Sequence, residues 1–123
     1  MEGKKYDLEE RTLEFSKRIL KMVRVLPRNS INEYYSSQIV RSSGSVGANY
    51  REANDALGKK DFVHRIKISR KESKETTYWI RLIMEYNSEL ASRMNNLLDE
   101  SIELTKILSS IIIKSENSKE KDL

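Results

Sequence analysis

The sequence predicts an all-α protein that folds as an up-down-up-down antiparallel four-helix bundle. Four segments repeat apolar residues at the three- and four-residue spacing of an amphipathic helix. Helix breakers are rare, because the 123 residues include four glycines and one proline, so long uninterrupted helices are expected. The links between the segments are only a few residues long, and short links between long helices make sequence neighbours antiparallel.

The first helix is predicted to begin at Asp7. Glu10 lies three positions later, which is a variant of the capping box, because an aspartate carboxylate can accept from the free amides of the first turn. Pro27 ends the helix, since the residue before a proline is pushed out of the α region. Its predicted core residues are Leu8, Phe15, Ile19, Met22, Val23 and Leu26.

The second helix is predicted to begin at Ser30, which forms a capping box with Glu33. We expect it to reach Leu57, with Gly58 as the left-handed residue just past its end. Residues 36–48 read SSQIVRSSGSVGA and hold five serines and two glycines, which are poor helix formers. Tertiary contacts are therefore needed to keep this stretch helical.

The third helix is predicted to begin near Asp61 and to end between Tyr86 and Glu89, and the fourth to begin near Ser92. The apolar face of the third helix holds Phe62, Ile66, Ile80, Ile83 and Met84. That of the fourth holds Met94, Leu97, Leu98, Ile102, Leu108, Ile111 and Ile112. Residues 1–113 thus form one bundle domain, and the charged stretch 114–123 is expected to be a disordered tail.

Composition argues against several classes of protein. The chain has no cysteine, which excludes disulfides, thiolate chemistry and cysteine zinc sites. No apolar run approaches the roughly 20 residues of a membrane helix, and the N-terminus lacks the apolar stretch of a signal peptide, so we expect a cytoplasmic protein. The single histidine, His64, cannot supply the paired Glu-x-x-His motifs of a di-iron bundle. We expect no metal, no cofactor and no enzyme activity.

Positive charge gathers on one face of the third helix. Between residues 59 and 90 there are eight basic and five acidic side chains. Two interpretations stay open: a solvated lysine-rich face, or a face that contacts RNA or DNA phosphates. On a helical wheel Tyr78 and most of the cations fall within about 40° of one line. The candidate nucleic-acid-binding residues are Lys60, His64, Lys67, Arg70, Lys71 and Lys74.

A polar stripe runs along the second helix at three- or four-residue spacing. Its members are Gln38, Arg41, Ser45, Asn49 and Glu52. We interpret this polar seam as a hydrogen-bond network that fixes helix register within or between subunits, with a ligand or catalytic site as the alternative. The carboxylates Glu52, Glu72 and Glu75 are expected to pair with Arg41 or Arg70, because carboxylates inside a bundle need a partner.

The central run QIVRSSGSVGANYREA, residues 38–53, resembles a known signature. The signature, Q-x-x-R-(A/S)-x-x-S-(I/V)-x-x-N-(I/x)-x-E-(G/A), belongs to four-helix bundle proteins encoded in intervening sequences of bacterial 23S rRNA genes. Residues 62–68 and 69–75 resemble the blocks that follow, and Pro27 before the second helix also fits. The resemblance covers roughly residues 7–113.

The resemblance implies a closed four-helix bundle, often assembled as a homopentameric ring. Related proteins include accessory proteins of diversity-generating retroelements, which bind nucleic acid and a reverse transcriptase. We therefore expect a homo-oligomer in which the basic face of the third helix contacts RNA or DNA. A structural or protein–protein interaction module without a nucleic-acid role is the alternative.

Overall fold

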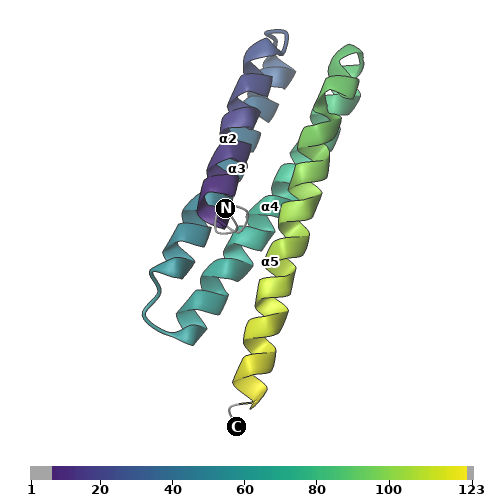
Figure 1. Ribbon diagram of the computed structural model, residues 1–123. Coiled ribbons are helices and arrows are strands. Elements are labelled where there is room, and N and C mark those ends of the chain that lie inside the picture. Colours follow the sequence, from purple (N-terminus) through teal and green to yellow (C-terminus); the bar gives the residue numbers. More distant parts are fainter. Residues whose placement is uncertain (1–6, 122–123) are drawn as a thin grey trace.

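The computed structural model describes residues 7–121, with side chains as far as Ser118. Four α-helices follow one another, with a short 3-10 segment before the last. Figure 1 shows that successive helices run in opposite directions, and the described residues contain no strand. The predicted all-α, up-down-up-down bundle is confirmed. The elements are α2 (Leu8–Val25), α3 (Ser30–Asn54), α4 (Lys59–Tyr86), η1 (Ser88–Met94) and α5 (Asn95–Lys121).

Both ends of α2 follow from the local sequence, as predicted. The Asp7 carboxylate accepts a hydrogen bond from the Glu10 amide at 3.2 Å, so the aspartate caps the first turn. At the other end Leu26 is extended, with ψ of 141°, directly before Pro27. The predicted core residues of this helix are buried, apart from Val23, which is half-buried.

The two ends of α3 correct the prediction. The helix begins at Ser30, but its cap is Asn29, whose side chain accepts from the Asn32 amide at 2.9 Å. It ends at Asn54 rather than Leu57, because Leu57 is fully exposed and no burial holds this last stretch helical. Gly58 is not left-handed: its φ of −159° is extended, and it precedes α4 as the N-cap residue.

The last helix also differs from the prediction at both ends. The 3-10 segment η1 occupies residues 88–94, so α5 begins at Asn95 and not near Ser92. Residues 114–121 continue α5, although a disordered tail was expected there. No glycine or proline interrupts α5, so nothing in its sequence forces an earlier end. Residues 1–6 and 122–123 lie outside the described part of the chain.

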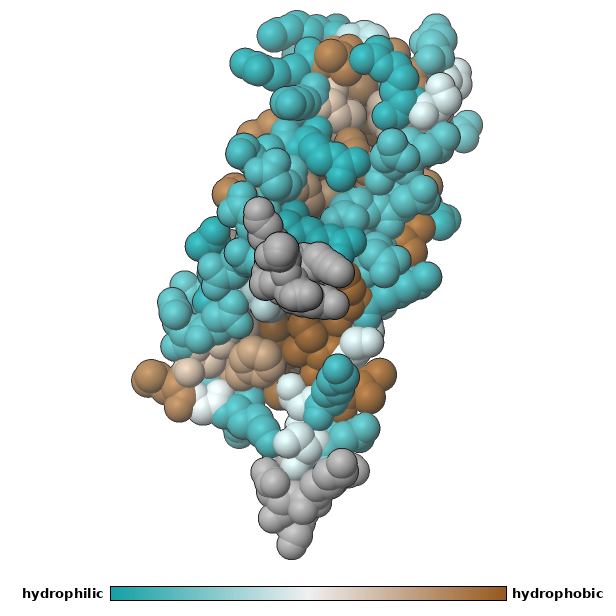
Figure 2. Space-filling model, viewed as in Figure 1, coloured by the Kyte–Doolittle hydropathy of each residue, from teal (hydrophilic) through white to brown (hydrophobic). Residues whose placement is uncertain are grey.

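One apolar core joins all four helices. Every predicted core residue of α4 and α5 is buried or half-buried, and the fully buried Leu104 was missed. Hydrophilic side chains cover most of the face shown in Figure 2, while a hydrophobic area lies between the helices in its lower half. On that face the polar side chains of the described residues leave part of the apolar interior uncovered.

A glycine allows α2 and α3 to approach closely. A Cβ atom on Gly47 would lie 2.8 Å from Thr12 Oγ1, which is closer than packed atoms allow. The Thr12 hydroxyl is itself held by the Leu8 carbonyl at 2.9 Å, so it has little room to move. Gly44, one turn earlier, faces only the Ser16 hydroxyl at 4.0 Å. The close approach therefore depends on Gly47 and not on Gly44.

Hydroxyl groups bridge the helices inside the bundle. Ser42 of α3 meets Thr76 of α4 at 2.8 Å, and Ser69 donates to the Val46 carbonyl at 2.7 Å. On the other side of α4, two hydroxyl pairs reach α5 at 2.7 Å each. The bonds to Ser42 and to the Val46 carbonyl hold the serine- and glycine-rich stretch of α3 against α4. We call the set the inner hydroxyl layer: Ser42, Ser69, Ser73, Thr76, Thr77, Ser101 and Thr105.

Candidate nucleic-acid interface

The outward face of α4 carries the predicted cations. Lys60, His64, Lys67, Lys71 and Lys74 are exposed, and Arg70 is half-buried at the side of the same face. Buried residues of α4 occupy the opposite side of the helix, including Ile66, Ser69, Ser73, Thr76 and Ile80. These six residues, five of them Lys or Arg, form a basic ridge about four helical turns long, at 3.6 residues per turn.

Most of the ridge keeps its charge unpaired. Lys67 Nζ lies 3.3 Å from Glu116 Oε2 of α5, and about half of each side chain is exposed, so this ion pair is weak. Among the described residues, Lys60, Lys71 and Lys74 make no ion pair. Their three ammonium groups are therefore free to meet an anion from solution.

Helix α5 lies beside the ridge and places an acidic residue next to one end of it and a basic residue next to the other. At one end, a surface hollow is lined by Lys60, His64 and Lys67 of α4 together with Glu116. At the other end, Lys106 of α5 joins Lys74 around a second hollow. Neither neighbour was predicted, because helical periodicity does not set the register of α5 against α4. The hollow between Lys74 and Lys106 is thus lined by no acidic residue, unlike the hollow that includes Glu116.

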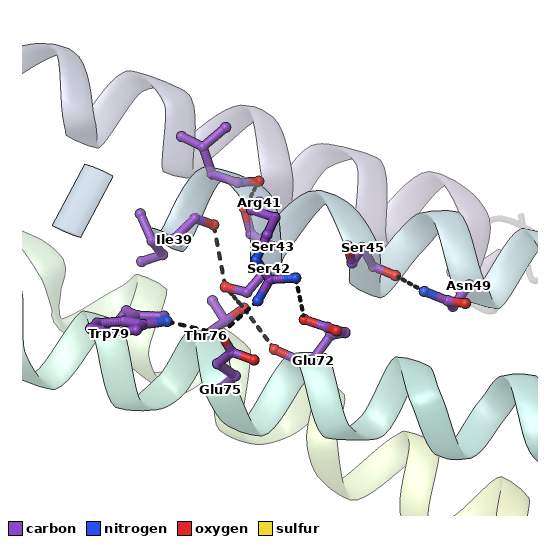
Figure 3. A network of polar contacts seen from close by, with 11 residues as sticks. Ile39, Arg41, Ser42, Ser43, Ser45, Asn49, Glu72, Glu75, Thr76 and Trp79 are labelled. Atoms are coloured by element: carbon purple, nitrogen blue, oxygen red, sulfur yellow. Dashed lines mark hydrogen bonds and ion pairs between the residues drawn. The ribbon is translucent and has the colours of Figure 1, made fainter. Parts of the chain in front are cut away.

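The polar seam runs along α3, and Figure 3 shows the part of it that faces α4. Arg41 Nη2 donates to Glu75 Oε2 at 2.6 Å, and Arg41 Nη1 lies 3.3 Å from Glu72 Oε1. Trp79 Nε1 also donates to Glu75 Oε2, at 3.2 Å. The expected pairing with Arg41 is confirmed for Glu72 and Glu75, and it ties the two helices together. For Glu52 the expectation is wrong, because this side chain is exposed and makes no ion pair within the described residues.

The ion pair changes the acidity of both partners. Burial by itself would raise the pKa of Glu75, but the hydrogen bonds from Arg41 and Trp79 and the charges of Arg41 and Lys71 outweigh it, so the pKa is lowered. The hydrogen bond to Glu75 outweighs desolvation at Arg41 and raises the pKa of its guanidinium. Both groups are therefore charged at neutral pH.

The other seam residues divide into two groups. Asn49 donates to the Ser45 carbonyl at 3.0 Å and accepts from Arg65 of α4 at 3.3 Å, so it also links α3 to α4. Gln38 is half-buried and Glu52 is exposed. Neither of these two side chains has a hydrogen bond or ion pair in the described part of the chain. The structure thus brings Arg41 and Asn49 into helix–helix contacts, whereas the bond of Ser45 to Asn49 stays within α3. Gln38 and Glu52 take no part in these contacts.

An aromatic cluster next to the ridge was missed. Its members are Tyr34 and Tyr35 of α3 and Tyr78, Trp79 and Tyr86 of α4. The Trp79 ring lies 5.2 Å from Tyr78, 5.8 Å from Tyr34 and 6.0 Å from Tyr35 between centroids, and Tyr35 lies 6.4 Å from Tyr86. Tyr34, Tyr78 and Tyr86 are exposed. The adjacent aromatic pairs 34–35 and 78–79 were the available signal, because antiparallel helices bring such pairs together.

A second basic group lies near the end of α2. Five cations and no acid occur between residues 15 and 32. Arg18 and Lys21 line a surface hollow of about 350 Å³ together with Arg93 of η1 and the apolar Val25 and Leu90. This run of cations is visible in the sequence but was not predicted as a site, because the acidic residues on either side of it balance its charge over a longer stretch. The cations of the run are Lys17, Arg18, Lys21, Arg24 and Arg28.

Two kinds of site are not found in the described residues. Residues 7–121 contain no cluster of three or more His, Asp or Glu side chains that could hold a metal ion. Within the same range, no helix combines the length and the apolar character that crossing a membrane requires.

Comparison with known proteins agrees with this architecture. Residues 4–110 match the family described as 23S rRNA-intervening sequence protein. The fold is similar to a crystal structure of a protein of unknown function from the S23 ribosomal protein family of Bacteroides thetaiotaomicron, with 35% identity and a TM-score of 0.74. That similarity covers 85% of this chain and 96% of the other. No curated protein matches the chain. The signature, the fold and the match over most of the length agree, and the chain belongs to the 23S rRNA-intervening sequence protein family.

Proposed function

We propose that this protein is a non-enzymatic nucleic-acid-binding bundle, with RNA as its preferred ligand and the basic ridge of α4 as its contact surface. One observation carries the proposal: Lys60, Lys71 and Lys74 project from a single helix face and make no ion pair among the described residues. A further cation, Lys106, extends the positive surface onto α5. The family's name, which refers to intervening sequences of 23S rRNA, supports an association with RNA.

The ridge has the chemistry that phosphates require. Lysines that neutralise phosphates release condensed counterions, and this gain does not depend on base sequence. An exposed lysine without an ion pair can bind a phosphate at little cost in free energy, because it does not first have to break an interaction with another protein group. The Lys67–Glu116 pair is the exception, and nucleic acid would compete with Glu116 for this lysine.

One ridge offers only a few phosphate contacts, so we propose that the protein acts as a homo-oligomer, with the pentamer implied by the family resemblance as the form to test. Repeating the ridge in each subunit turns weak contacts into avidity. The hydrophobic area in Figure 2 supports an assembled form, because a second copy would cover it. A reverse transcriptase is the protein partner to try first.

The test measures affinity for a structured RNA as a function of salt concentration. We expect log K to fall linearly with log[salt], and neutralising Lys67, Lys71 and Lys74 together to glutamine should make this slope shallower by roughly two to three. The matched control neutralises Lys17, Lys21 and Arg24 on α2. Absence of binding at low salt, a flat salt response, or equal losses in both variants would contradict the proposal.

A structural or protein-interaction module is the second candidate. The ion pair between Lys67 and Glu116 favours it, because it shows that part of the ridge is neutralised within the chain. In that case, capture of a protein partner would be insensitive to the three lysine substitutions, and RNA affinity would be absent at every salt concentration.

A further inference from the structure

We propose that the aromatic cluster extends the ridge into a site for an unpaired nucleic-acid strand, with bases stacking on Tyr78 and Tyr34 while the lysines hold the phosphates. This inference rests on the proposed function and specifies its ligand: a single strand of RNA or DNA rather than a duplex. Single-strand sites combine a basic track with aromatic platforms, because every base presents a π-face whatever its identity.

Tyr78 continues the line of lysines along the outward face of α4. Tyr78 lies four residues after Lys74 and seven after Lys71, so on one helix it follows them along the same outward face. Tyr78 is 58% exposed, so its ring is accessible from solvent. A strand whose phosphates contact Lys71 and Lys74 therefore meets the Tyr78 ring next.

The rings of Tyr78 and Tyr34 both contact Trp79 through edge-to-face geometry. Tyr78 meets Trp79 at an interplanar angle of 69°, and Tyr34 meets Trp79 at 82°. These are edge-to-face contacts, so neither tyrosine is stacked face to face on its neighbour. Trp79 is fixed by its hydrogen bond to Glu75 and supports both tyrosines. The exposed rings are thus held in place and still offer surface for stacking.

The charged residues around the aromatic cluster bear on the kind of partner it binds. A cluster of tyrosines and a tryptophan also suits a protein interface, but lysine is depleted at the centres of such interfaces. Here Lys71, Lys74 and Arg81 are exposed on the same helix as Tyr78. Glu75, which borders the cluster, is already held by Arg41 and Trp79. Two exposed carboxylates, Glu33 and Glu85, adjoin Tyr34 and Tyr86, so the positive charge that favours an anionic partner lies around Tyr78.

Stacking on an exposed tyrosine requires an unpaired base, which a single strand offers and a duplex does not. In an A-form helix the bases are stacked on one another, and the major groove is too narrow for side chains to read. A tyrosine projecting from a convex helix can stack only on a base that is already splayed out. The aromatic cluster can therefore add affinity for an unpaired strand and adds none for a duplex.

The experiment compares an unstructured oligouridylate of about 12 nucleotides, within the usual range for one such site, with an RNA duplex of equal length. Fluorescence anisotropy gives both affinities at one salt concentration. Tyr78→Ala should weaken single-strand binding by roughly 5- to 100-fold, the usual effect of losing one stacked base, and leave duplex binding unchanged. Tyr78→Phe should retain the affinity, because it keeps the ring.

The matched control is Leu20→Ala, which truncates a similarly exposed apolar side chain on α2. It should change neither affinity. The single tryptophan, Trp79, supplies a second measurement, since it belongs to the cluster and reports on it by fluorescence. The oligouridylate should quench Trp79 emission, and the duplex should not.

The outcomes separate the two proposals. If the lysine variant loses RNA affinity while Tyr78→Ala loses none, or if the duplex binds as tightly as the single strand, the stacking site is wrong and the basic ridge stands. If neither RNA binds at low salt, both proposals fail. If Tyr78→Ala lowers the oligomer mass in the absence of RNA, the cluster is a subunit interface, and this also overturns the inference.

Discussion

The inner face of α4 carries buried hydroxyl groups, and its outer face carries exposed ammonium groups. On the inner face, the hydroxyls of Ser69, Ser73 and Thr76 each have a hydrogen-bond partner on a neighbouring helix. On the outer face, Lys60, Lys71 and Lys74 have no ion-pair partner in the described structure. Buried polar groups must be satisfied within the protein, whereas exposed charges are satisfied by water until a ligand arrives. Stability therefore depends on the inner face, and the outer face is available for binding.

The largest effect is expected at a buried amide pair. The side chains of Asn32 and Asn87 donate to each other at 2.9 Å in both directions. Asn87→Ala leaves the Asn32 amide without this partner and creates a small cavity, so we expect a loss of about 2 to 4 kcal/mol in the free energy of unfolding. Chemical denaturation measures it, with the exposed Asn95→Ala as control. A loss equal to that of the control would show that the amide pair contributes nothing.

The next effect concerns the contact between α2 and α3. Gly47→Ala should destabilise the protein by about 1 to 3 kcal/mol, because the added methyl collides with Thr12. Gly44→Ala has room for its methyl and gains helix propensity, so it should stabilise by up to about 1 kcal/mol. Thermal denaturation of both variants provides the comparison. The same sign for both would mean that the close approach at Gly47 is not required.

A smaller, pH-dependent effect is expected at the boundary between the two faces. The lowered pKa of Glu75 means that its pairing with Arg41 stabilises the fold above the ordinary value of 4.5. This stabilisation is lost as the pH falls below that value and through the lower folded-state pKa. Glu75→Gln should therefore cost at most about 1 kcal/mol at pH 7, since the pair is partly exposed.

Urea denaturation at several pH values measures this contribution. The difference between the Glu75→Gln variant and the unmodified protein should narrow as the solution becomes more acidic. The exposed Glu85→Gln serves as the control, and its curve should follow that of the unmodified protein throughout. A difference that stays constant with pH would contradict the assigned cause.

The smallest effect on stability is expected on the ridge. Lys71→Gln and Lys74→Gln should change the free energy of unfolding by no more than about 0.5 kcal/mol, because both side chains are exposed and make no ion pair. The same variants should reduce RNA affinity if the proposed function is right. A loss of several kcal/mol on unfolding would show instead that the outer face is structural, and the contrast between the two faces would fail.

Local interactions made much of the fold predictable. Asp7 and Pro27 act on their own helix ends, so the limits of α2 followed directly from the sequence. The cap of α3 was misassigned because Asn29 and Ser30 are both good capping residues, and local preference did not distinguish them. At Gly58, a left-handed end was expected from residue type alone, but the unpacked Leu57 ended the helix earlier.

The part of the candidate site that lies on α4 alone was predictable, and the parts contributed by other helices were not. The basic ridge lies on one helix, and helical periodicity alone places its side chains on one face. Lys106 and Glu116 come from α5, and the aromatic cluster combines α3 with α4. Contacts between helices depend on their relative register, which a periodic pattern leaves open within a turn.

The sequence by itself determined the helices, their apolar faces, the antiparallel order and the row of cations on α4. Each of these follows from 3.6-residue periodicity, capping chemistry and short links, which act within a few residues. Only the tertiary structure decided which hydroxyls meet, why Gly47 is required, which lysine is neutralised and where the aromatic rings gather. These depend on atoms far apart in the chain, and close packing sets their distances to within an ångström.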